Sequence, residues 1–147
     1  MTIRKQFLFA CVAIIFGVGF ALGSVLRGTQ VVEAQSATRV FELRTYTTPE
    51  GKLDDLQARF RDHTIGLFER HGMTNIGYWT PQDTPSSSNT LIYIIAHNSR
   101  EITQANWQAF GNDPEWQRVS RESQLDGRIV NNVESVFLDP TDFSPIQ

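Results

Sequence analysis

The stretch RVFELRTYTTPEG, from Arg39 to Gly51, has the composition of a β-strand followed by a turn, yet it carries charges in its middle. Val, Phe, Leu, Thr and Tyr favour extended chain. Side chains alternate across a strand, so Phe41, Leu43 and Thr45 share one face, while the other face carries Val40, Glu42, Arg44 and Tyr46. Charges bracketed by Val and Tyr indicate a covered face, where each polar group needs a partner.

The N-terminus has the features of an export segment. Arg4 and Lys5 precede an uncharged run over residues 7–26, about the 20 residues that span a bilayer. Val32-Glu33-Ala34 then supplies the small residues that a signal peptidase selects. Two alternatives stay open for residues 1–34: a secretory signal cleaved after Ala34, or an uncleaved membrane anchor with its basic end inside. Both predict a periplasmic or otherwise extracytoplasmic domain.

The charge and cysteine content of the chain exclude several classes of binding partner and site. The formal net charge is −3, and the chain without residues 1–34 keeps 10 basic and 15 acidic residues, a net charge of −5. A mildly acidic domain argues against nucleic acid or anionic lipid as partner, which leaves residues 7–26, if uncleaved, as the expected membrane contact. Cys11 is the single cysteine, so the domain after the export segment has no disulfide, thiolate zinc site or cysteine nucleophile.

The remaining residues show alternating strand and helix patterns. Leu53, Leu56, Phe60, Thr64 and Leu67 recur at helical spacing, and "TLIYIIAHN" is apolar on both faces of a strand. The patterns predict a linker at 35–38, strands at 39–47, 75–80, 90–98 and 129–138, helices at 52–71, 100–110 and 114 to about 125, and a tail at 139–147.

Several local details are predicted as well. Ser99 is expected to cap the helix at 100–110, with Ile102, Ala109 and Phe110 facing inward. Asp113 followed by Pro114 predicts the start of the next helix. The tail is expected to dock through Phe143.

The order β-α-β-β-α-β predicts an α+β fold, a ferredoxin-like sandwich with helices on one face of the sheet. That arrangement leaves the other face bare, although the strand at 90–98 is apolar on both sides. A second copy of the same sheet is the most economical cover, which predicts an obligate homodimer. Glu42 and Arg44 are then expected to face the interior between two sheets.

The chain from Val40 to about Phe137 resembles the NIPSNAP family. The most specific segments are Glu42-Leu43-Arg44-Thr45-Tyr46, Phe60-Arg61-Asp62-His63-Thr64, His71-Gly72, Gly77-Tyr78-Trp79 and Asp113-Pro114-Glu115-Trp116. The resemblance implies a dimeric α+β barrel but no defined activity. Better-known members are mitochondrial, with roles in trafficking and mitophagy; the export segment and the single domain argue against carrying those roles over. Relatives by fold include cofactor-free monooxygenases, lactone isomerases and haem-processing enzymes.

Glu42 and Arg44 are the first candidate site residues. Lying two residues apart on one strand face, they form either a buried structural ion pair or a site whose guanidinium awaits a carboxylate or enolate. Tyr46, in phase with them, either donates to the same ligand or seals the end of the barrel.

Histidines supply the candidate catalytic groups. His63 and His97 are each either structural or a general acid or base, whereas His71 before Gly72 is typical of a helix C-terminus. His63 and His71 are about 12 Å apart along a helix, too far to share a metal ion. No zinc helix motif, phosphate-binding glycine loop or nucleophile-elbow serine is present, and no metal or cofactor is expected.

Tyr78, Trp79 and Tyr93 are further candidates for lining a ligand cavity, although tryptophans are more often core or interface residues. The sequence therefore predicts an exported homodimer that binds a small, partly apolar molecule in a polar-lined barrel cavity. Two alternatives remain: a cofactor-free isomerase or monooxygenase that uses His63 or His97 with Arg44, and an interaction module with a filled barrel.

Overall fold

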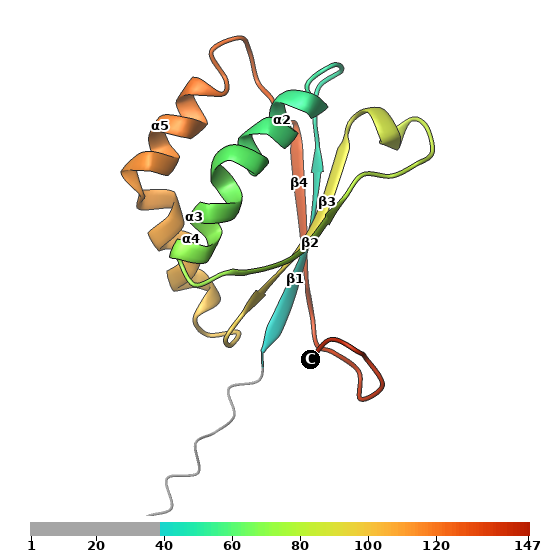
Figure 1. Cartoon of the computed structure of the whole chain (residues 1–147), viewed down its shortest axis with the longest axis vertical. Helices are drawn as coiled ribbons and strands as arrows, with labels where there is room; N and C mark the ends of the chain where they lie inside the picture. The colour runs from blue at the N-terminus through green and yellow to red at the C-terminus, as the bar shows by residue number, and fades with distance from the viewer. Residues whose placement is uncertain (1–38) are drawn as a thin grey trace, which may run out of the picture. The chain divides into compact units, whose positions relative to one another are not determined.

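The computed structural model describes residues 39–147, in which four antiparallel strands form one sheet with helices on one face (Figure 1). The predicted export segment at 1–34 and the predicted linker at 35–38 lie outside the described residues. The strands are β1 (Val40–Thr47), β2 (Thr74–Trp79), β3 (Thr90–His97) and β4 (Asn132–Leu138), in the order β2-β3-β1-β4. This topology confirms the predicted α+β, ferredoxin-like sandwich.

The first helical segment follows β1 and runs as α2 (Leu53–Arg59), η1 (Phe60–Thr64) and α3 (Ile65–Arg70). The sequence predicted one regular helix here, but η1 is π-helical. The Thr64 hydroxyl donates to the backbone oxygen of Arg59 at 3.2 Å, across this wider turn. Both Arg59 and Phe60 are buried where it begins. Such single π-turns often occur at functional sites.

The second helical segment comprises α4 (Thr103–Asn112) and α5 (Pro114–Glu122), and a short helix η2 (Ser86–Ser88) lies in the loop before β3. Asp113 caps α5 as predicted, because its side chain accepts from the backbone amides of Glu115 and Trp116. Among residues 39–147, no helix has the length and apolar character needed to cross a membrane.

Helix α4 differs from its prediction in both start and orientation. It begins at Thr103, so Ser99 does not cap it, and Ile102 and Ala109 are exposed. Thr103 and Asn106 are buried in their place, together with Phe110. Polar side chains with hydrogen-bond partners inside the domain therefore override the apolar pattern that guided the prediction.

Tyr93 lies at the centre of the core and is 0% exposed. Its ring centroid is 5.2–5.9 Å from those of Tyr46, Phe60, Phe68 and Tyr78. The prediction that β4 begins at residue 129 is wrong, because Ile129 precedes the strand and is fully buried in this core. The aromatic core packs the sheet against the helices of the same chain.

The orientation of β1 corrects the prediction for Glu42 and Arg44. Their side chains contact Trp107 of α4, so they face the helices of the same chain and not the helix-free side of the sheet. Tyr93, the direct cross-strand partner of Arg44, lies on this face as well. The buried charges of β1 are thus part of the subunit interior.

The opposite face of the sheet has no helix over it (Figure 1). Val136, Leu138 and Trp79 are 53%, 37% and 51% exposed. The tail does not dock through Phe143, which is 84% exposed. Instead, other residues of the tail line a shallow groove of about 240 Å³ with residues of the sheet: Pro140, Thr141, Ser144 and Ile146 beside Phe41, Ile76, Ile94 and Leu138.

Candidate functional site

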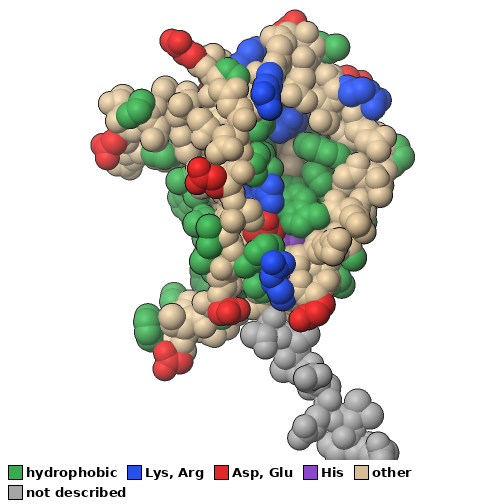
Figure 2. All heavy atoms as spheres, turned by 180° about the vertical axis from the view of Figure 1, so that it is seen from behind, with side chains coloured by type: hydrophobic (Ala, Val, Ile, Leu, Met, Phe, Trp, Pro, Cys, Tyr) green, Lys and Arg blue, Asp and Glu red, His purple; other side chains and the backbone are tan. Residues whose placement is uncertain are grey.

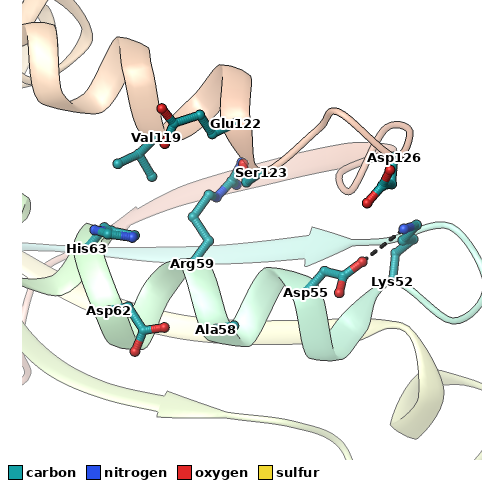
Figure 3. Close-up of a pocket in the computed structure, with 10 residues that line it drawn as sticks. All are labelled: Lys52, Asp55, Ala58, Arg59, Asp62, His63, Val119, Glu122, Ser123 and Asp126. Atoms are coloured by element: carbon teal, nitrogen blue, oxygen red, sulfur yellow. Dashed lines mark hydrogen bonds and ion pairs between the residues drawn. The ribbon is translucent and has the colours of Figure 1, made fainter.

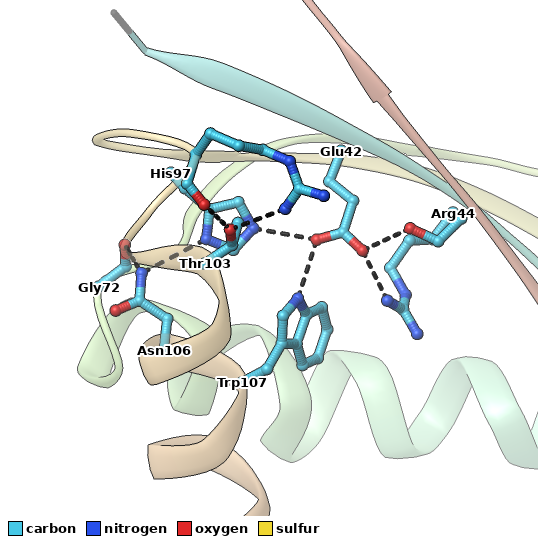
Figure 4. A network of polar contacts seen from close by, with 9 residues as sticks. Glu42, Arg44, Gly72, His97, Thr103, Asn106 and Trp107 are labelled. Atoms are coloured by element: carbon cyan, nitrogen blue, oxygen red, sulfur yellow. Dashed lines mark hydrogen bonds and ion pairs between the residues drawn. The ribbon is translucent and has the colours of Figure 1, made fainter. Parts of the chain in front are cut away.

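A buried carboxylate organises the polar residues between the sheet and the helices (Figure 4). Glu42 is 1% exposed and accepts four hydrogen bonds. Its Oε1 accepts from Arg44 Nη1 and from Ser135 Oγ, both at 2.6 Å. Its Oε2 accepts from Trp107 Nε1 at 2.8 Å and is 3.0 Å from His97 Nε2. Because a carboxylate has about four acceptor positions, Glu42 is saturated.

His97 is held in one tautomer by its two neighbours. The Asn106 amide nitrogen donates to the backbone oxygen of Gly72 at 3.2 Å and lies 3.3 Å from His97 Nδ1. Since a backbone oxygen only accepts, this nitrogen is the donor, and His97 Nδ1 must accept from it. His97 Nε2 then carries the hydrogen and donates to Glu42. Both ring nitrogens are therefore engaged inside the domain.

The hydrogen bonds hold Glu42 in its charged form. Burial alone would raise the pKa of this carboxyl, but hydrogen bonds from His97, Ser135, Trp107 and Arg44 outweigh burial and lower the pKa to about 2. Glu42 is thus a fixed anion at neutral pH and has no oxygen available to act as a general base.

Arg44 is held in place by Glu42 and by aromatic rings, but part of its guanidinium is unused. Its Cζ lies 4.3 Å from the ring centroid of Trp107 and 5.6 Å from that of Tyr46. Its side chain is 17% exposed, and its buried Nε makes no hydrogen bond with any described residue. Burial alone would lower the pKa of the Arg44 guanidinium. The phenols of Tyr46 and Tyr93 and the Glu42 carboxylate outweigh burial, so the pKa lies above its usual value.

Arg59 is a second buried arginine, and it lacks an acid partner. It is 7% exposed, and no carboxylate oxygen of residues 39–147 lies within 4.0 Å of its nitrogens. Its Nη1 donates to Ser123 Oγ at 3.4 Å, and its Cζ lies 5.2 Å from the ring centroid of Trp116. Burial lowers the pKa of Arg59, and the phenols of Tyr46 and Tyr93 offset this only in part.

Three buried side-chain atoms in the described domain lack a hydrogen-bond partner: Arg44 Nε, Arg59 Nε and Tyr93 Oη. All three carry a hydrogen to donate. Tyr93 is the cross-strand neighbour of Arg44. Burial, Tyr46 and Tyr78 raise the pKa of Tyr93 well above its usual value, although Arg44 opposes the shift, so its hydroxyl stays protonated.

The layer that holds these donors is open on one side. Figure 2 shows a hollow between the helices and the sheet, with basic, acidic and histidine side chains at its floor and hydrophobic side chains beside them. The partial exposure of Arg44 is consistent with access from solvent.

His63 lies in a separate groove (Figure 3). The groove has a volume of about 310 Å³ and lies between the helical segment α2–η1 and helix α5. Arg59 reaches across it toward Ser123 (Figure 3). The two candidate catalytic histidines are therefore in different places, since His97 belongs to the Glu42 network. The groove is lined by Lys52, Asp55, Ala58, Arg59, Asp62, His63, Val119, Glu122, Ser123 and Asp126.

The other predicted lining residues are divided between the two faces of the sheet. Tyr78 stacks on Tyr93 at 5.3 Å between ring centroids, and its hydroxyl donates to Asn75. Trp79 is half exposed, and its ring covers Gly77, where an added Cβ would lie 2.5 Å from it. Tyr46 and Tyr93 lie beside Arg44, while Trp79 lies on the opposite face. Among residues 39–147, no group of His, Cys, Asp and Glu could hold a metal ion.

Sequence reasoning missed Arg59, Trp107, Trp116 and Ser135. Arg59 could have been identified from the sequence, because it follows Leu56 by three positions. It therefore lies on the apolar face of its helix, where a charged residue is unusual. Nothing in the sequence joins the Trp107 indole to Glu42, 65 residues away.

The charge of Glu42 should make stability depend on pH. A carboxyl whose pKa is lowered by folding stabilises the fold above its unfolded pKa, near 4.5, and loses that contribution as the pH falls toward 2. We expect Glu42→Gln to lower the free energy of unfolding at pH 7 by about 3 kcal/mol, from the size of the pKa shift. Urea unfolding of both proteins between pH 7 and 2.5 measures this. A difference that stays constant below pH 4 would contradict the assignment.

Solved structures share this fold. The chain superimposes with a TM-score of 0.65 on a NIPSNAP family protein of unknown function from Agrobacterium tumefaciens, at 21% identity, covering 77% of this chain and 96% of that one. A second NIPSNAP family protein from A. tumefaciens gives 0.64 at 23% identity, covering 74% and 99%. An uncharacterised NIPSNAP-like domain protein from Burkholderia xenovorans gives 0.63 at 19% identity, covering 74% and 90%.

No protein with a curated description matches the chain. The family model for NIPSNAP matches residues 41–145, which include all of the sheet and helices except the first residue of β1. The chain belongs to the NIPSNAP family.

Proposed function

We propose that this protein binds a small, partly apolar molecule between its sheet and its helices. The observation that best supports this proposal is how the Arg44 guanidinium is held. Its Nη1 is fixed by a saturated carboxylate, while its Nε is buried without a partner and its side chain remains partly exposed. A guanidinium so fixed, with donors to spare, is preorganised to receive an acceptor group of a ligand.

The surroundings of Arg44 supply apolar contact. Trp107 and Tyr46 lie against its guanidinium, and both rings are only partly buried. Phe60 contacts Tyr46 edge-on at 5.7 Å between ring centroids. Ligand sites commonly combine aromatic walls with a few fixed polar groups. The site proposed lies inside one subunit, unlike the cavity between two sheets that the sequence predicted.

Binding is better supported than catalysis at this site. Glu42 has no unpaired oxygen, and both ring nitrogens of His97 are hydrogen-bonded within the domain. A general base must be within hydrogen-bond reach of the proton it takes, with an unoccupied lone pair. His63 lies in the groove between η1 and α5. The role of Glu42 and His97 is to hold Arg44 in position.

We also propose that the protein is an exported homodimer. Large apolar side chains are exposed on the helix-free face of the sheet, including Val136, Leu138 and Trp79. Contiguous apolar patches of more than a few hundred Å² are rare on monomers. Two copies of one such face are self-complementary, so a single two-fold contact covers both. The basic residues and apolar run at 1–34 support export.

The binding proposal is tested through Arg44→Lys. Lysine can keep the ion pair with Glu42 but has no Nε–Nη2 edge, so the fold should persist while binding is lost. The probes are 2-substituted naphthalenes carrying a carboxylate, a carboxamide, a methyl ketone or a hydroxyl. We expect at least one, at about ten times its Kd, to stabilise the wild type by about 1.4 kcal/mol in thermal unfolding, and none to stabilise Arg44→Lys.

Arg118→Lys is the matched control, because Arg118 pairs with Glu122 at 2.6 Å on the exposed surface of α5. It should respond to the probes like the wild type. If the probes stabilise Arg44→Lys and the wild type equally, Arg44 is not part of a binding site. If none of the probes stabilises the wild type, the site does not bind molecules of this kind.

The dimer is tested with Ile94→Asp, which places a charge on the helix-free face without touching the subunit core. We expect sedimentation at micromolar concentration to show a wild-type dimer and a folded Ile94→Asp monomer, because a charge buried in that contact would be unpaired. Ala109→Asp, on the exposed side of α4, is the control and should remain dimeric. A wild-type monomer would contradict the proposal.

Export is tested on the full-length chain expressed in a Gram-negative host. We expect the protein in the periplasmic fraction, with Gln35 as its first residue if the signal is cleaved, or in the inner membrane with Met1 intact if it is an anchor. N-terminal sequencing distinguishes the two. Full-length protein found only in the cytoplasm would show that residues 1–34 do not direct export.

A further inference from the structure

The groove between α2–η1 and α5 keeps a buried cation apart from the acids that share it (Figure 3). Arg59 is 7% exposed, and the same space of about 310 Å³ is lined by four carboxylates, those of Asp55, Asp62, Glu122 and Asp126. None of their oxygens lies within 4.0 Å of a nitrogen of Arg59. A buried charge is normally paired directly. The volume that separates these groups is at the small end of the range for small-molecule sites.

The Arg59 guanidinium has hydrogen bonds still to donate in this groove. It is held by Ser123 Oγ, 3.4 Å from Nη1, and by Trp116, whose ring centroid is 5.2 Å from Cζ. Its Nε is buried without a partner. Its Nη2 makes no hydrogen bond with a described residue either, but it is not fully enclosed, so a molecule in the groove can reach it. The guanidinium is therefore fixed and lacks an acceptor, which a carboxylate supplies best.

The acids of the groove also lack cations. Two of the four carboxylates are neutralised, one by Lys52 at 2.9 Å and one by Arg118 at 2.6 Å. The other two, those of Asp62 and Asp126, form no ion pair within residues 39–147. With histidine counted as neutral, Arg59 and these two acids leave one positive and two negative charges uncompensated. A simple anion would be repelled by the acids, and a simple cation would leave Arg59 unpaired.

We propose that this groove binds an amino acid with a basic side chain, whose carboxylate is held by Arg59. Its α-ammonium group pairs with Asp62, one helical turn from Arg59, and its side-chain ammonium group pairs with Asp126. Such a molecule has one negative and two positive charges, the complement of the uncompensated charges in the groove. The π-helical turn η1 begins directly after Arg59 and contains Asp62, so it sets the spacing of the two groups. The site is separate from the one around Arg44 and does not depend on it.

Three compounds separate the contributions of the ligand's charges. L-Lysine carries all three charged groups, L-norleucine lacks only the side-chain ammonium group, and cadaverine lacks only the carboxylate. We expect isothermal calorimetry on the full-length wild type to show L-lysine binding at least about tenfold more tightly than either of the others. The reason is that L-norleucine leaves Asp126 unpaired, while cadaverine leaves the buried Arg59 unpaired.

Two variants assign these contributions to the chain. Arg59→Met removes the cation without breaking an ion pair and should bind L-lysine about tenfold more weakly than the wild type, but cadaverine within about twofold of it. Asp126→Asn, at an exposed position, should weaken L-lysine about tenfold and leave L-norleucine within about twofold. The controls are Arg121→Met and Asp142→Asn, which change exposed residues outside the groove and should bind L-lysine like the wild type.

Cadaverine binding as tightly as L-lysine would overturn the proposal, because an acidic surface that merely attracts cations behaves in that way. Unchanged L-lysine affinity in Arg59→Met, or no binding of L-lysine to the wild type at about 10 mM, would overturn it as well. If Arg59→Met does not fold, the ligand series on the wild type and on Asp126→Asn still decides. Arg44→Lys should keep the wild-type affinity for L-lysine, so failure of this site and failure of the proposed function are distinguishable.

Discussion

A carboxylate inside a protein stays charged only where hydrogen bonds replace the water it has lost, and Glu42 meets this condition with four donors. The donors come from β1, β3, β4 and α4, so one side chain joins three strands to a helix. Removing any one donor weakens a contact between elements. Removing the Glu42 carboxylate leaves all four donors without their acceptor. The position of α4 over the sheet, and with it the orientation of Arg44, depends on this carboxylate.

The two buried arginines differ because Arg44 forms an ion pair with Glu42, whereas Arg59 forms no ion pair within the described residues. Arg44 is offset by Glu42 and restrained by Trp107, so its spare donor has a defined direction. Arg59 enters from the helical side at the start of the π-helical turn, and its only hydrogen bond within the described residues is a long one to Ser123.

The two faces of the sheet carry different kinds of side chain. On the helix side lie the Glu42 network, the aromatic core around Tyr93 and both arginines. On the helix-free side lie apolar side chains with Trp79 among them, and the tail at 139–147 borders this surface. Because the donors face the subunit's own helices, each copy would carry a complete site. Pairing of two sheets would then serve to bury apolar surface and would not build the site.

The sequence alone determined the element order, the ferredoxin-like fold and the cap at Asp113, because these follow from periodicity and local backbone chemistry. It also placed Glu42 and Arg44 on one face of a strand, since alternation is a local property. It did not determine what covers that face: both faces of β3 are apolar, and the prediction that a second sheet covers Glu42 and Arg44 was wrong, because helix α4 covers them. Only tertiary packing joined Glu42 to Trp107 and Arg59 to Trp116, because those contacts connect residues far apart in the chain whose types show no pairing signal.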